Sequence, residues 1–78
     1  MPVICSAVDT TFSPAAGPFL AQVTGGGSAI LWRRSDATAE WAVAERLPQN
    51  RSVDVPNPVA GAQYRFEAIG DVVVRAHQ

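Results

Sequence analysis

The feature that most constrains this chain is a rhythm of short apolar runs between Ala21 and Ala76, interrupted by Gly, Pro and Asp. The clearest runs are Ser28–Arg34 and Gln63–Ile69. In the second run Tyr64 and Phe66 alternate with polar residues, and a period of two places such neighbours on opposite faces of a β-strand. No segment requires the longer period of a helix. The sequence therefore predicts an all-β fold.

Strands are expected wherever these runs lie between turn residues. We predict strands over 19–24, 29–34, 51–55, 63–69 and 72–76, with loop over 9–18. Residues 39–47 are ambiguous, because their Ala, Glu and Leu content favours helix while Trp41 and Val43 alternate as in a strand. We interpret them as a strand that forms a hairpin with 29–34. Gly25–Gly27 and Gly70–Asp71 predict two further hairpin turns.

These elements make a small antiparallel β-sandwich or jelly-roll-like barrel of six to seven short strands. Residues 1–78 are expected to form a single β-domain. Val3 to Val8 fits either a first strand or a docking arm that lies on a neighbour, so residues 1–18 are an arm plus loop in the second case. A chain of 78 residues buries only a small core and is marginally stable alone.

Covalent and metal reinforcement is not expected in this small core. Cys5 is the only cysteine, and His77 is the only histidine, so we predict neither disulfide, metal nor other cofactor. Elimination leaves oligomerisation, for which a trimer is one solution, or docking onto a larger body.

The charge balance argues against two classes of partner. The sequence contains six Arg, no Lys and seven acidic residues, which gives a net charge of −1. Nucleic-acid binders instead carry a basic excess. No apolar run approaches the ~18 residues that span a membrane. Met1–Cys5 lacks the pattern of a secretory signal. We therefore predict no nucleic-acid and no membrane partner.

Catalytic residue types do not cluster anywhere in the sequence. Gly25–Ser28 is followed by an apolar strand rather than by the Lys and helix of a phosphate-binding loop. Cys5 lies in an apolar stretch that suits a core residue, and His77 is expected on a frayed end. Asp36 and Asp71 fall in turns, where Asp bonds its own backbone. We predict that the protein is not an enzyme.

Interface chemistry is concentrated in one run. Ala29 and Leu31 point to one face of the expected strand and Ile30 and Trp32 to the other. One of these apolar faces should meet the core, and a partner or a covering loop should meet the other. Trp32 is followed by two arginines, and both residue types are enriched in binding hot spots. Alternatively, the arginines pair with Glu40 or Glu45 across the hairpin. Trp41, Tyr64 and Phe66 are expected in the core. The candidate interface residues are Val3, Ile4, Ile30, Trp32, Arg33 and Arg34.

Three motifs give the chain a family resemblance. They are Val23-Thr-Gly-Gly-Gly-Ser-Ala-Ile-Leu-Trp-Arg-Arg-Ser-Asp36, then Glu40-Trp41-Ala-Val43, then Asn57-Pro58-Val-Ala-Gly61-Ala-Gln-Tyr64-Arg65-Phe66. The layout resembles small virion proteins of tailed bacteriophages, over roughly Phe19 to Ala76. Trp32 stands where that family usually has a polar residue, and Ala37-Thr38 replaces its turn glycines.

The resemblance implies a β-sandwich carried on the phage particle. Its leading implication is a decoration or cement protein at the capsid surface, made in the host cytoplasm, which stabilises the head by bridging major capsid subunits. A tail, connector or head-fibre component is the alternative within the virion. From a different class, a carbohydrate- or receptor-binding module would use Trp32 and the nearby arginines, and would need exposed aromatic rings.

Overall fold

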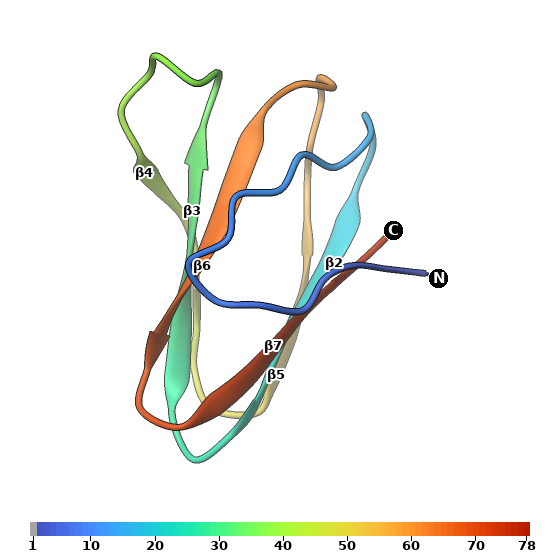
Figure 1. The fold of residues 1–78 in the computed structure, drawn as a ribbon. Helices are drawn as coiled ribbons and strands as arrows, with labels where there is room; N and C mark the ends of the chain where they lie inside the picture. The colour runs from blue at the N-terminus through green and yellow to red at the C-terminus, as the bar shows by residue number, and fades with distance from the viewer. Residues whose placement is uncertain (1) are drawn as a thin grey trace.

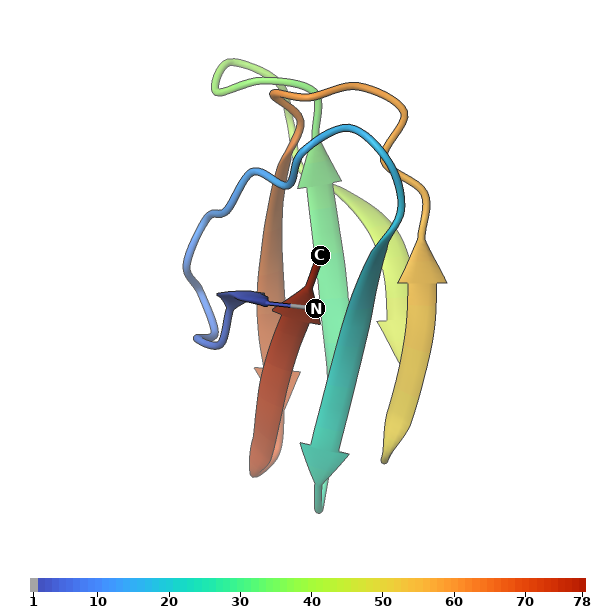
Figure 2. The ribbon, with the colours of Figure 1, turned by 90° about the vertical axis from the view of Figure 1, so that its right-hand side faces the viewer.

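The computed structural model describes residues 2–78 and consists of two packed antiparallel sheets (Figures 1 and 2). One sheet has the order β1-β7-β2-β5 and the other β4-β3-β6. The prediction of an all-β sandwich is confirmed. Strand bounds are β1 Val3–Cys5, β2 Phe19–Gly25, β3 Ser28–Arg34, β4 Ala42–Leu47, β5 Arg51–Val55, β6 Gln63–Ile69 and β7 Val72–His77.

The strand pairing follows the scheme of a jelly roll. An isolated antiparallel bridge joins Phe12 to Tyr64, so the loop between β1 and β2 contributes a rudimentary eighth segment. With it, the first segment pairs with the last (β1 with β7), the second with the seventh (Phe12 with β6), the third with the sixth (β2 with β5) and the fourth with the fifth (β3 with β4). The chain is thus one long hairpin rolled into two sheets.

Both predicted glycine hairpins are wrong, because each turn crosses from one sheet to the other. β2 and β3 lie in different sheets, as do β6 and β7, and the two turns pack together at the lower end of Figure 1. The N–H of Gly26 donates to the carbonyl of Asp71 at 3.0 Å. Gly25 has a φ of +119°, and a Cβ there would lie 2.8 Å from the same carbonyl oxygen. Turn chemistry did not distinguish a hairpin from a crossover, since both require glycine.

The hairpin between β3 and β4 is confirmed, with one correction at its start. β4 begins at Ala42 rather than Ala39, and its register with β3 shifts between Leu31 and Trp32. Trp41 therefore precedes the strand and is half-buried at the surface instead of lying in the core. The predicted strand over 3–8 is also shorter, since β1 ends at Cys5.

The core lies between the sheets and is lined by alternate residues of the long strands. It contains Cys5, Phe19, Ala21, Val23, Ala29, Leu31, Leu47, Val55, Ala62, Tyr64, Phe66, Val74 and Ala76. Phe12 completes an aromatic cluster, with its ring centroid 5.6 Å from that of Phe66 and 6.0 Å from that of Phe19. The Tyr64 and Phe19 rings meet edge to face at 4.8 Å. Tyr64, Phe66 and the free Cys5 are buried, as predicted.

A buried polar network ties the loops at the upper end of Figure 1 to this core. The Tyr64 hydroxyl donates to Oδ1 of Asn57 at 3.2 Å and accepts a bond from Nε of Arg33 at 3.1 Å. Asn57 is 1% exposed, and its Nδ2 donates to the carbonyl of Ala15 at 2.7 Å. One amide thus satisfies backbone groups of a loop more than forty positions away, which would otherwise be costly to bury.

The C-terminus is held in place, so the expectation of a frayed end is wrong. His77 is the last residue of β7 and pairs with Val3 and Leu20. The Gln78 side chain accepts from the N–H of Ala15 at 2.7 Å and donates to the carbonyl of the same residue at 2.9 Å. Its backbone N–H donates to Pro2 at 3.1 Å. These bonds join both ends of the chain to the loop over 9–18.

Replacing Tyr64 by Phe tests the buried network. The ring packing is retained, but Oδ1 of the buried Asn57 loses its donor, so we expect a loss of about 1–3 kcal/mol in the free energy of unfolding. Urea denaturation measures it. In the Tyr64→Phe/Asn57→Ala double variant the loss should fall below the sum of the single losses, because the two side chains share one interaction. Additive losses would contradict a direct bond.

Neighbouring glycines provide a matched test of the interlocked turns. An alanine Cβ at Gly27 would overlap the carbonyl of Ile69, whereas at Gly26 the nearest atom is the Asp71 oxygen at 4.0 Å. Gly27→Ala should therefore destabilise the fold by more than about 2 kcal/mol, and Gly26→Ala should change it by less than about 0.5 kcal/mol. Thermal unfolding compares the two variants. Equal effects would contradict the packing of the two turns.

Candidate functional site

The candidate site is the outward face of the β4-β3-β6 sheet, called here the β3 outer face. Its residues alternate along the three strands with the core residues. Ile30 and Trp32 lie on the central strand, β3. The predicted two-sided character of β3 is confirmed, because Ala29 and Leu31 are buried while Ile30 and Trp32 are half-exposed. The face comprises Ser28, Ile30, Trp32, Arg34, Val43, Arg46, Gln63, Arg65, Glu67 and Ile69, with Trp41 at its upper end.

Two arginines lie against the Trp41 ring. The guanidinium carbon is 4.4 Å from the ring centroid for Arg34 and 4.9 Å for Arg65. Arg34 is further held by its Nε, which donates to Oε1 of Gln63 at 2.7 Å. The Nε of Arg65 is buried and has no hydrogen-bond partner among residues 2–78. Attraction to the face of an indole ring offsets part of the cost of covering these charges.

Trp32, the other tryptophan of the face, is held by a hydrogen bond. Its indole N–H donates to Oε1 of Glu67 at 3.0 Å. Glu67 lies on β6, diagonally across from Trp32, whose direct partner on that strand is Arg65. The two tryptophans of the face therefore have polar neighbours that hold their orientation before any partner binds.

The loop over 35–41 positions Trp41 above these strands. Oδ1 of Asp36 accepts bonds from the backbone N–H and the hydroxyl of Thr38, at 2.9 and 2.7 Å, and from the N–H of Ala39 at 3.1 Å. The hydroxyl bond from Thr38, with help from the backbone bonds, lowers the pKa of the Asp36 carboxyl below its ordinary value. The predicted self-bonding of Asp36 in a turn is confirmed.

The β3 outer face carries a positive charge in a chain that is negative overall. Arg34, Arg46 and Arg65 contribute three positive charges. Glu67 is the single carboxylate among the residues that make up the β3 outer face. Three against one leaves the face at +2, while the whole chain carries −1. This local excess suits an acidic partner surface.

The six candidate interface residues fall into separate groups. Ile30, Trp32 and Arg34 share the β3 outer face. Arg33 points the other way, to the Tyr64 hydroxyl, and Val3 and Ile4 lie on β1 in the other sheet. Neither arginine forms the expected hairpin pair with Glu40 or Glu45, because their Nε atoms bond Tyr64 and Gln63 on β6 instead.

Among the aromatic and cationic residues of the face, three were missed at the level of sequence: Trp41, Arg46 and Arg65. The alternation of β6 already placed Arg65 outward, on the same side as Gln63 and Glu67. A strand order with β6 beside β3 would have brought Arg65 next to Trp32, but the assumed hairpin between β6 and β7 concealed that pairing. Trp41 had no such signal, because its position depends on where β4 begins.

Across residues 2–78, no group of three His, Cys, Asp or Glu side chains is arranged to hold a metal ion. No helix among them is long and apolar enough to cross a membrane. Sγ of the buried Cys5 donates to the carbonyl of Ala7 at 3.5 Å.

Replacing Thr38 by Val tests how the loop over 35–41, which carries Trp41, is held. The loss of the hydroxyl bond should raise the pKa of Asp36 towards its ordinary value, which a carbon-detected NMR titration measures. Because folding depresses this pKa, the contribution of Asp36 to stability is present above its unfolded pKa and is lost as pH falls through the folded value. Thr10→Val is the control, because the Thr10 hydroxyl donates to the carbonyl of Val8 and not to Asp36. An unchanged pKa in Thr38→Val would contradict the assignment.

Comparisons with known proteins do not identify this surface. No family model, curated protein or solved structure matches the chain.

Proposed function

We propose that this protein is a structural component of a virion that docks on the capsid through the β3 outer face and bridges neighbouring capsid subunits. The observation that carries the proposal is the gathering of two tryptophans and three arginines on one sheet face of a chain with net negative charge. Trp and Arg bury large areas while offering hydrogen-bond donors, so they dominate the energetics of protein interfaces.

The order of these side chains favours a docking role. Arg34 and Arg65 already lie against the Trp41 ring, and the indole N–H of Trp32 donates to Glu67. Long side chains that are fixed before binding lose less conformational entropy when the complex forms. The outward guanidinium groups also attract an acidic surface over a distance of about a Debye length.

The family resemblance of the sequence supports a virion role for such a module. Jelly rolls recur in viral capsid proteins, which is an analogy of fold and not of site. A protein that bridges subunits needs a second contact surface, and β1 offers one at the edge of the other sheet. Val3 and Ile4 are 50% and 36% exposed there, and Val73 on the adjoining strand is 50% exposed. This edge is our candidate for contacts between copies, including a trimer.

Among other functions, a carbohydrate-binding module would place bare aromatic rings at the surface. Both tryptophans are instead half-buried. Guanidinium groups lie against the Trp41 ring, and the indole N–H of Trp32 donates to Glu67. This arrangement favours a protein partner. A tail or connector component would use the same face, and differs only in where it lies on the particle.

Charge reversal on the β3 outer face tests the proposal. The Arg34→Glu/Arg65→Glu variant should bind at least about tenfold more weakly to purified heads of the phage that encodes it, because each lost hot-spot contact costs about 1–2 kcal/mol. Co-sedimentation measures binding. Arg75→Glu, an exposed position on β7 of the other sheet, is the matched control and should bind normally. Wild-type protein that ignores both immature and expanded heads would overturn the capsid proposal.

A further inference from the structure

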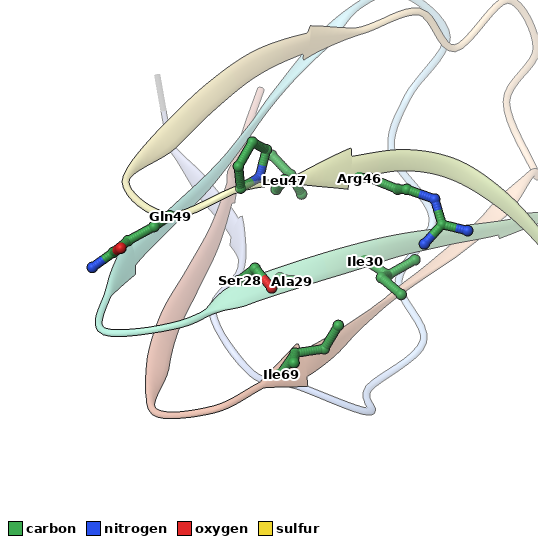
Figure 3. A pocket seen from close by; sticks show the side chains of 8 residues that line it. Ser28, Ala29, Ile30, Arg46, Leu47, Gln49 and Ile69 are labelled. Carbon is green, nitrogen blue, oxygen red and sulfur yellow. The ribbon is translucent and has the colours of Figure 1, made fainter.

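A hollow of about 390 Å³ opens at the lower end of the β3 outer face (Figure 3). Its lining includes Ser28 and Ile30 on β3, Arg46 on β4, Pro48 in the following turn and Ile69 on β6. All three strands of the sheet therefore contribute to it. The hollow is distinct from the upper end of the face, where Trp41 covers the strands.

The hollow exists because a small residue occupies the central strand between larger neighbours. Ser28 pairs with Ile69, and the next outward residue, Ile30, pairs with Arg46. The Ser28 side chain leaves space that the two isoleucines and Pro48 surround. Ile69 is 51% exposed, although burying a side chain of that size is favourable by about 1.5–3 kcal/mol. An apolar group entering from outside would bury this surface.

The charge beside the hollow indicates what should accompany that apolar group. Arg46 is the only charged residue in the lining. Glu67 on β6 pairs with Ile30, as Arg46 does from β4, but its carboxylate already accepts the Trp32 N–H. A carboxylate supplied by a partner therefore finds a guanidinium at the rim of an apolar hollow, and such pairs are strong and directional.

We propose that the hollow receives one aliphatic side chain of an extended acidic segment of the partner protein, whose adjacent carboxylate pairs with Arg46. This inference rests on the proposed docking face and specifies the chemistry that the face recognises. The small Ser28 sets the depth of the hollow, Ile30, Pro48 and Ile69 supply its apolar contacts, and Arg46 selects acidic neighbours.

The probe that tests this site is a capped hexapeptide with Leu-Asp at its centre, added at millimolar concentration to the ¹⁵N-labelled protein. We expect saturable shifts of the amide signals of Ser28, Ile30 and Ile69. A peptide with Ser in place of Leu should bind at least about tenfold more weakly, and so should one with Lys in place of Asp. Shifts confined to another region, or equal binding of all three peptides, would overturn the inference.

Variants of the protein separate the parts of the site. Ser28→Leu fills the hollow from the outer face and should abolish the peptide shifts, whereas Ser52→Leu on exposed β5 is the matched control and should retain them. A further peptide carries Asn in place of Asp and should bind the wild type more weakly than the Asp peptide does. The Arg46→Gln variant should bind the two peptides equally, and its dispersed spectrum should show that the fold is intact. If Ser28→Leu still bound the peptide, the hollow would not be the site.

Binding to capsid heads distinguishes this inference from the proposed function. If Ser28→Leu binds heads normally while Arg34→Glu/Arg65→Glu does not, the docking face stands and the hollow plays no part in docking, which overturns the inference alone. If both variants lose binding and Ser52→Leu retains it, the inference is supported. If the wild type binds the peptide but no heads, the recognition chemistry holds and the capsid proposal fails.

Discussion

Tyr64 is the side chain on which the rest of this structure depends. Its ring joins Phe12 and Phe19 between the two sheets, and its hydroxyl bonds the buried amide of Asn57. A sandwich this small has few apolar residues to spare, so its upper loops cannot be covered by a second layer of core. The amide instead satisfies the backbone of the long loop over 9–18, and Phe12 anchors the same loop among the rings. Loops that are held in this way fix the ends of the strands below them.

The sequence was sufficient to predict the strands but not their order. Alternation in β2 and β6 identified which side chains face inward, because one buried face imposes a period of two. The arrangement of strands depended on turns such as Gly25–Gly27, where glycine permits a hairpin and a crossover alike. The contribution of Phe12 was hidden as well, since a single bridged residue in a loop has no periodic signal.

The candidate site was partly visible in the sequence for the same reason. The run over 29–34 was apolar on both faces, which made Ile30 and Trp32 candidates for an interface. The structure places both at the surface. Arg65 and Trp41 join them only through the order of strands and the start of β4, which are properties of the folded chain. The result is one sheet face with fixed aromatic and cationic side chains, on a protein whose net charge would not suggest it.

The proposed function requires that the β4-β3-β6 sheet faces the partner. A cryo-electron microscopy map of heads incubated with the protein tests it most directly, because the two sheets of the sandwich differ in strand number and are separable at moderate resolution. We expect density in which this sheet lies against the shell, with Trp32 and Arg46 at the contact and β1 directed towards neighbouring copies. A map with the β1-β7-β2-β5 sheet against the shell would contradict it.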